Sequence, residues 1–211
     1  MTPYYQDDSC TIYHADCRDI LPQLEPVDLV LTDPPYGIGE DGGDKKRRRD
    51  YEPLVVHEKF NWDQDRPNRE IFQMIFACSK HQAIFGGNYF TDYLPPSMGW
   101  IYWDKRMGGD FSDGELIFTS QKKALRRFDV SPFENLRGGH DRQHPTQKPL
   151  SLMKYIILRF ENAQTILDPF MGSGTTLVAA KNLDRKAIGI EREEKYCEIA
   201  VKRLSQEVLS L

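Results

Sequence analysis

One stretch, Leu29-Val30-Leu31-Thr32-Asp33-Pro34-Pro35-Tyr36, decides the fold. Its apolar part predicts a buried strand, and the prolines end that strand because they disrupt a backbone hydrogen-bond ladder. Asp33 and Tyr36 are therefore expected on the loop at the carboxyl end of the strand, where ligands bind in open α/β sheets. An acceptor and an aromatic ring held on rigid prolines suit a flat, hydrogen-bonding ligand such as a nucleobase.

Strand and helix patterns alternate on both sides of this stretch. That alternation predicts an α/β fold with a mostly parallel, doubly wound sheet. The expected strands cover residues 11–15, 27–31, 82–85, 99–103, 115–119, 165–167 and 187–190. The expected helices cover residues 68–80, 149–160, 177–182 and 193–209, with a short helix over 20–24 capped by Asp19.

Length and composition restrict the class of protein. A chain of 211 residues allows one domain, 1–211, with a small insertion. Its net charge is −4, so a polyanionic partner would have to be held by local basic patches. The four cysteines form no CxxC pair, which indicates reduced thiols in a cytoplasmic protein without a zinc site. The N-terminus is too polar for an ordinary signal peptide, and no apolar run approaches the ~18 residues of a membrane helix.

Two segments carry concentrated basic charge. Residues 37–66 form a long, glycine-containing loop that we expect to be mobile, and residues 121–144 interleave basic and aromatic side chains. Both fit contacts with nucleic acid, whereas the alternatives are a solvated loop tip and a polar connection. The candidate DNA-binding residues are Lys45, Lys46, Arg47, Arg48, Arg49, Lys122, Lys123, Arg126, Arg127, Arg137 and Arg142.

A second motif lies in the strand-loop-helix-strand unit over residues 165–191. Gly172 and Gly174 allow a tight turn and a close approach of ligand to backbone. The helix that follows presents its amino-terminal amides to that ligand. Glu191 ends the next strand, where an acid can bind ribose hydroxyls. The unit predicts a nucleoside cofactor, and Asp168 suits a cationic ligand better than a pyrophosphate.

Together these motifs resemble the amino DNA methyltransferases that use S-adenosylmethionine and act on adenine N6 or cytosine N4. The resemblance extends from Thr11 to Leu204. Asp33-Pro34-Pro35-Tyr36 is similar to the catalytic tetrapeptide of that family, and Asp168-Pro169-Phe170-Met171-Gly172-Ser173-Gly174-Thr175-Thr176 to its cofactor loop. Two further segments are similar to family motifs, Asp16-Cys17-Arg18-Asp19 and His144-Pro145-Thr146-Gln147-Lys148-Pro149.

The order of the motifs resembles the circularly permuted β class, because the catalytic motif precedes the cofactor loop. The resemblance implies a seven-stranded Rossmann-like sheet and a short target-recognition region at about 105–143. It also implies S-adenosylmethionine as cofactor, S-adenosylhomocysteine as product, no metal, and double-stranded DNA as partner. A homodimer and a cognate restriction enzyme are compatible with it.

The resemblance assigns roles to individual residues. The catalytic residues are Asp33, Pro34, Pro35 and Tyr36. The cofactor-binding residues are Asp16, Cys17, Asp33, Lys148, Asp168, Pro169, Phe170, Gly172, Ser173, Gly174, Thr175, Thr176 and Glu191. For two of them a structural role is the alternative: Cys17 as a packed residue and Lys148 as a surface lysine at a helix start.

The implied reaction is methylation of the N6 amine of a flipped adenine at specific DNA sites. Asp33 favours adenine, because the tetrapeptide of cytosine-N4 enzymes more often begins with serine. Methylation of cytosine N4 remains an alternative, as does a DNA-binding protein that keeps the fold without turnover. Methylation of cytosine C5 is set aside, since no cysteine follows a proline here.

Overall fold

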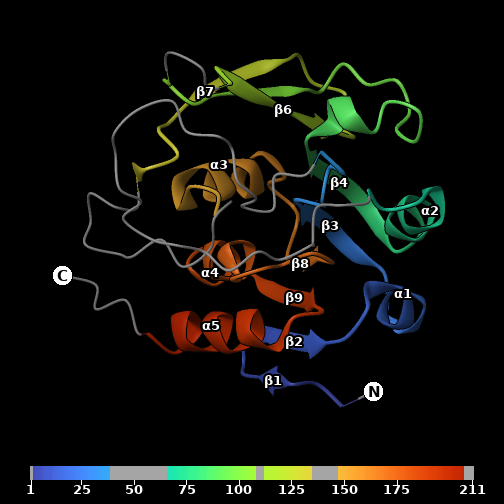
Figure 1. Ribbon diagram of the computed structural model, residues 1–211, viewed down its shortest axis with the longest axis vertical. Coiled ribbons are helices and arrows are strands. Elements are labelled where there is room, and N and C mark those ends of the chain that lie inside the picture. The colour runs from blue at the N-terminus through green and yellow to red at the C-terminus, as the bar shows by residue number, and fades with distance from the viewer. Residues whose placement is uncertain (1, 39–65, 108–111, 135–146, 207–211) are drawn as a thin grey trace.

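The computed structural model describes residues 2–38, 66–107, 112–134 and 147–206, in which a twisted sheet is covered by helices (Figure 1). The strands are β1 (Tyr5–Gln6), β2 (Cys10–His14), β3 (Val27–Thr32), β4 (Ser79–Phe85), β5 (Ile101–Asp104), β6 (Gly114–Thr119), β7 (Arg126–Asp129), β8 (Thr165–Asp168) and β9 (Lys186–Glu191). The α-helices are α1 (Cys17–Ile20), α2 (Arg69–Ala77), α3 (Leu150–Arg159), α4 (Thr175–Lys181) and α5 (Glu194–Ser205).

The nine strands of the described chain form one sheet in the order β1-β2-β9-β8-β3-β4-β6-β5-β7. Only β1 and β6 run against the others. This confirms the predicted mostly parallel sheet. The seven inner strands, in the sheet order β2-β9-β8-β3-β4-β6-β5, correspond to the expected seven-stranded core. The short strands β1 and β7 extend its two edges.

The two motif-bearing strands are neighbours. β3 pairs in parallel with β8, with Leu29 opposite Ile166 and Val30 opposite Leu167. From β3 the chain crosses through α2 to β4, whereas from β8 it crosses through α4 to β9 on the other side. The chain therefore diverges between β3 and β8, and ligands bind at such a switch point, beyond the carboxyl ends of the strands.

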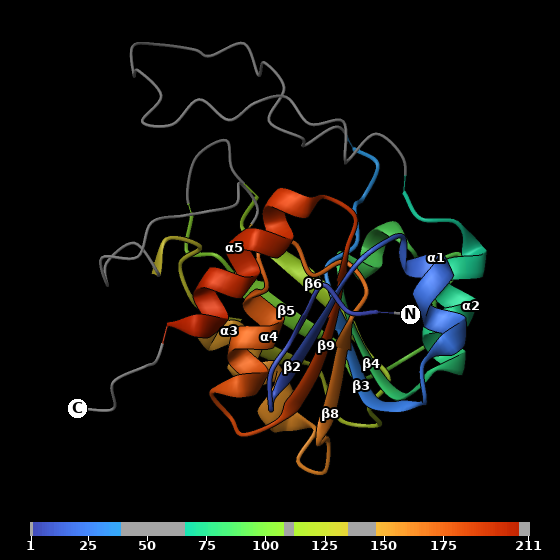
Figure 2. The same ribbon diagram turned by 90° about the horizontal axis from the view of Figure 1, so that it is seen from below.

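Helices cover both faces of the sheet, as Figure 2 shows, with α3, α4 and α5 on one face and α1 and α2 on the other. The first group buries apolar side chains such as Leu152 and Ile156 against the strands. Ile71 and Ile75 of α2 pack against the opposite face. These fully or nearly buried side chains are the apolar stripes that the helical periodicity predicts.

Some element boundaries differ from the sequence predictions. Asp16, and not Asp19, caps α1, because its carboxylate accepts a hydrogen bond from the Arg18 backbone N–H at 2.9 Å. The predicted helix over 20–24 is a 3-10 turn over Leu21–Gln23. Residues 126–129, which are not among the predicted strands, form β7 because the free edge of β5 offers them hydrogen-bond partners.

The predicted loop over 37–66 lies mostly outside the described residues, as does the part of the target-recognition region from 135. Among the helices that the structure describes, none has the length and apolarity needed to cross a membrane.

Candidate active site

A cavity of about 670 Å³ opens at the carboxyl ends of β3, β8 and β9. It brings the two motifs together, since the segment after β3 and the loop after β8 line the same space. All of the predicted catalytic and cofactor-binding residues line the cavity except Gly174. The sequence distance between the motifs is thus bridged by the pairing of β3 with β8.

Asp168 ends β8 and is 3% exposed. One carboxylate oxygen accepts hydrogen bonds from Thr32 Oγ1 at 2.8 Å and from the Phe170 backbone N–H at 3.1 Å, and the other accepts from Thr176 Oγ1. Burial raises the pKa of Asp168 to about 6, although these hydrogen bonds act in the opposite direction. The carboxylate therefore fixes the loop and leaves negative charge at the cavity wall at neutral pH.

The loop after β8 is held by α5. Gly174 is the N-cap of α4 and has φ +78°, and a Cβ added there would lie 2.8 Å from Cβ of Ala200. The Arg203 guanidinium donates to the Ser173 carbonyl at 2.6 Å and to Thr175 Oγ1 at 3.1 Å. Burial lowers the pKa of Arg203 to about 10. Sequence patterns did not reveal Arg203, because no local motif marks it.

Glu191 ends β9 beside this loop. Its Oε2 accepts from the Gly172 backbone N–H at 3.0 Å, and its Oε1 accepts from the Glu193 backbone N–H at 2.8 Å. Burial raises the pKa of Glu191. Each oxygen has capacity for one more hydrogen bond, which is what a pair of ribose hydroxyls requires.

Asp33 and Tyr36 form the other wall. The Tyr36 hydroxyl donates to Asp33 Oδ1 at 2.6 Å, and the Tyr36 ring stacks on Tyr89 at 4.8 Å between centroids. Gly86 has φ +60° and lies against the Tyr36 ring, where an added Cβ would be 2.3 Å from Cε1. Burial raises the pKa of Tyr36 well above 10, so the phenol stays protonated. The sequence patterns predicted no role in the site for Gly86 or Tyr89. The segment Gly86-Gly87-Asn88-Tyr89 nevertheless follows a buried strand, as Asp33 does.

Lys148 lies at the centre of this wall and is only 8% exposed, so the surface-lysine alternative is wrong. Its Nζ is 2.6 Å from Asp33 Oδ2 and 3.5 Å from Glu115 Oε2. Burial lowers the pKa of Lys148, but the two carboxylates outweigh it and the pKa is raised. Lys105 Nζ lies 2.7 Å from Glu115 Oε1. No motif pointed to Glu115 or Lys105.

Cys17 is a packed residue at the start of α1. It is 6% exposed, and burial raises the pKa of its thiol to about 12, so it is not poised to act as a nucleophile. Within the described residues, histidine, cysteine and acidic side chains form no cluster suited to a metal ion.

Comparison with known proteins identifies the family. The N6/N4 methylase model, described as DNA methylase, matches residues 55–202. The chain belongs to the N6/N4 DNA methylase family.

This DNA methylase is 50% identical over 248 aligned residues to the type II methyltransferase M.HinfI of Haemophilus influenzae, covering 93% of the chain and 68% of that protein. The structure of the M1.HpyAVI–SAM complex matches with a TM-score of 0.62 and 26% identity, over 93% of this chain and 99% of that one. PvuII DNA methyltransferase, named as cytosine-N4-specific, matches with a TM-score of 0.65 over 99% of this chain and 90% of that one. Its 16% identity shows the fold alone.

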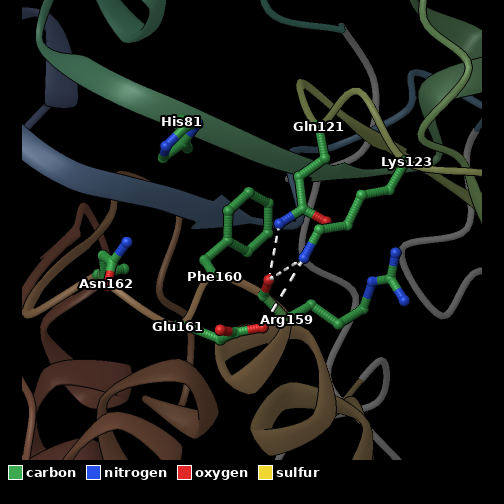
Figure 3. A pocket seen from close by; sticks show the side chains of 8 residues that line it. His81, Gln121, Lys123, Arg159, Phe160, Glu161 and Asn162 are labelled. Atoms are coloured by element: carbon green, nitrogen blue, oxygen red, sulfur yellow. Dashed lines mark hydrogen bonds and ion pairs between the residues drawn. The ribbon is translucent and has the colours of Figure 1, made fainter.

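The described basic candidates of the DNA methylase do not line the cavity. Lys122 and Lys123 follow β6, which runs antiparallel to β4 and ends with Thr119 opposite Ala83, so the chain beyond β6 leads away from the carboxyl end of β4, and neither lysine lines the cavity. Figure 3 shows Lys123 directed at Arg159 and Glu161, with its Nζ 3.5 Å from the Arg159 carbonyl oxygen.

Arg126 and Arg127 lie on β7, also away from the cavity. The Arg127 guanidinium is paired with Asp104 at 2.8 Å and with Asp129 at 2.6 Å. The other basic candidates, Lys45, Lys46, Arg47, Arg48, Arg49, Arg137 and Arg142, lie outside the described residues.

Proposed function

We propose that this protein transfers a methyl group from S-adenosylmethionine to the N6 amine of an adenine flipped out of double-stranded DNA. The observation that carries the proposal is the shared cavity, in which Asp33 and Tyr36 face the same space as Asp168 and Glu191. The similarity to M.HinfI, a type II methyltransferase, supports a restriction-modification role with a cognate restriction enzyme.

The residues present fit the cofactor. The cavity volume is within the range of small-molecule sites. Glu191 offers acceptor capacity for ribose hydroxyls, and Asp168 offers the negative charge that a sulfonium favours. Phe170 and Ile190 add apolar surface to the same cavity. S-Adenosylmethionine supplies an electrophilic methyl group, and the structure of a similar protein in its SAM complex supports this cofactor.

The protein's part in the reaction is to prepare the amine. The lone pair of an exocyclic amine is conjugated with the base and is therefore weakly nucleophilic. The Asp33 carboxylate and the Pro34 carbonyl accept the two N–H groups, which favours a more tetrahedral nitrogen. Tyr36 stacks on the flipped base, and positioning of the base provides much of the acceleration. No side chain becomes covalently attached.

Adenine is the favoured target because the tetrapeptide begins with Asp33. Methylation of cytosine N4 is the second candidate, since an enzyme named for that specificity shares the fold. A non-catalytic DNA-binding protein is less well supported, because the cavity keeps both carboxylates, the ring and the ordered loop.

Mass spectrometry of nucleosides tests the target. DNA from a methylation-free host is incubated with the purified protein and S-adenosylmethionine, then digested. We expect N6-methyladenine, with Tyr36→Ala as a control that loses the product. N4-methylcytosine without N6-methyladenine would overturn the choice of adenine. Neither product, together with no binding of S-adenosylmethionine, would favour the non-catalytic alternative.

A further inference from the structure

We propose that Glu115 is a positioning residue for methyl transfer, because it offers Lys148 a second carboxylate and so frees Asp33 to accept the amine of the target base. This inference rests on the proposed function, which gives Asp33 that task. Glu115 belongs to β6 and lies outside every motif that the sequence resemblance supplies, the nearest along the chain being His144–Pro149.

Four charged side chains of alternating sign line one wall of the cavity. They run from Asp33 through Lys148 and Glu115 to Lys105, joined by contacts of 2.6, 3.5 and 2.7 Å. None of their side chains is more than 22% exposed. The row places two carboxylates on either side of a single ammonium group, that of Lys148.

The two carboxylates share Lys148 unequally. Its short contact is with Asp33 Oδ2, while Glu115 Oε2 is buried and has no hydrogen-bond partner among the described residues. An unsatisfied buried acceptor is costly, and a charged one more so. A movement of about 0.7 Å by Lys148 Nζ would give Glu115 a charge-assisted hydrogen bond of ordinary length. Glu115 is therefore a vacant acceptor within reach of the ammonium.

In the proposed reaction, Asp33 must accept a hydrogen bond from the amine of the base. Its Oδ1 accepts from the Tyr36 hydroxyl and its Oδ2 accepts from Lys148, and these two strong bonds weaken Asp33 as an acceptor for the amine of a base. A shift of Lys148 toward Glu115 weakens the stronger of these two bonds, which is the charge-assisted one. The negative charge needed at Asp33 is retained.

The strand geometry keeps Glu115 in place. Glu115 pairs with Trp103 in the β5–β6 ladder, and its Oε1 is held by Lys105, whose Nζ lies 5.2 Å from the Trp103 ring. The charged and titratable groups facing this row are Tyr36 beside Asp33 and Asp168 on β8. Glu115 is thus a fixed acceptor and Lys148 the group that moves.

Glu115→Gln tests the proposal through the pH profile of kcat. The variant lacks the second carboxylate, so Lys148 stays on Asp33 and we expect kcat to fall by about tenfold or more. The acid limb of the profile should move to lower pH, because loss of a nearby negative charge favours ionised Asp33. The dissociation constant of S-adenosylmethionine should stay within about twofold, since Asp168 and Glu191, from which the cofactor fit is argued, are unchanged.

Lys105→Met is a second test, in which the acid limb of the pH profile is expected to move in the opposite direction. Without Lys105, Glu115 attracts Lys148 more strongly and a positive charge is lost near Asp33, so the acid limb should move to higher pH. If either residue had a purely structural role, its variant would have a lower melting temperature, but the acid limbs of the two variants would not move in opposite directions. This second test also keeps the proposal testable if Glu115→Gln does not fold.

Asp104→Asn is the matched control. The Asp104 side chain on β5 is 20% exposed and pairs with Arg127 on the neighbouring β7, outside the cavity. Loss of the Asp104 charge should therefore leave kcat and the acid limb unchanged. The proposal is overturned if Glu115→Gln has the wild-type kcat and acid limb, or if its effect is undiminished in a Lys148→Met background. A wild-type protein that binds cofactor but methylates no DNA would instead refute the proposed function.

Discussion

Replacing Gly86 with alanine is expected to impair methyl transfer while sparing cofactor binding. Gly86 has φ +60°, where an L-residue costs about 1–2 kcal/mol. The new Cβ would lie 2.3 Å from Tyr36 Cε1, whereas carbon atoms need about 3.5 Å. The Tyr36 ring must therefore move by about 1 Å and release its 2.6 Å hydrogen bond to Asp33, a bond to a charged group that contributes about 1.5–3 kcal/mol.

These effects set the expected magnitudes. The free energy of unfolding should fall by about 3–5 kcal/mol, which lowers the melting temperature of a domain this size by roughly 10 °C. A displacement of about 1 Å at a positioning side chain can cost on the order of 100-fold in rate. Single-turnover methyl transfer gives the rate, calorimetric titration with S-adenosylmethionine gives the affinity, and thermal unfolding gives the stability.

Gly174→Ala is the matched control, because Gly174 also has a positive φ and a close neighbour but lies in the cofactor loop. We expect that variant to lose cofactor affinity and to keep its transfer rate at saturating cofactor. The reasoning fails if Gly86→Ala keeps the wild-type rate. It fails equally if the two variants lose affinity and rate in the same proportion.

Three further predictions follow from charge and burial. The affinity for S-adenosylmethionine should fall about tenfold between pH 7 and pH 5, because the pKa of Asp168 is about 6 and its protonation removes negative charge from the cavity; titrations with Asp168→Asn should lack this dependence. Asp28→Ala should lower stability by about 2 kcal/mol at pH 7 in urea unfolding, since Asp28 binds Lys80 at 2.8 Å and the Thr165 backbone N–H at 3.0 Å. Lys80 and these hydrogen bonds lower the pKa of Asp28, so the stability that Asp28 contributes is present above about pH 4 and is lost as the pH falls further. An Asp28→Ala variant as stable as the wild type at pH 7 would contradict this prediction. Iodoacetamide at pH 8 should alkylate Cys17 only in urea, as mass spectrometry of the proteolytic peptide that contains Cys17 would show, because burial keeps the thiol protonated and covered.

The sequence predicts the parts of the site that are locally encoded. Asp33, Asp168 and Glu191 each end an apolar run, and proline or glycine follows two of them within a few positions. Strand ends can therefore be located from the local sequence pattern alone, and parallel strands bring their carboxyl ends to one edge of the sheet. For the same reason the predicted alternation of strands and helices matches the observed sheet closely.

Other parts depend on contacts that no local pattern encodes. Glu115 lies on the antiparallel β6 and Lys105 directly follows β5, and the pairing of β6 with β4 and β5 places both residues at the cavity. In Asp16-Cys17-Arg18-Asp19, two aspartates three positions apart are equally suited to cap a helix, and the helix that forms is the one that Asp16 caps. The basic charge of Arg127 was visible, but its ion pair with Asp104 on the neighbouring strand was not.

The central claim is that one cavity has two halves, with Asp33 acting on the base and Asp168 and Glu191 holding the cofactor. Asp33→Ala tests it most directly when cofactor affinity and methyl transfer are measured on the same preparation. The account predicts a dissociation constant for S-adenosylmethionine within about threefold of the wild type and a transfer rate lower by about 10²- to 10³-fold. A variant that keeps the full transfer rate, or that no longer binds the cofactor, would contradict it.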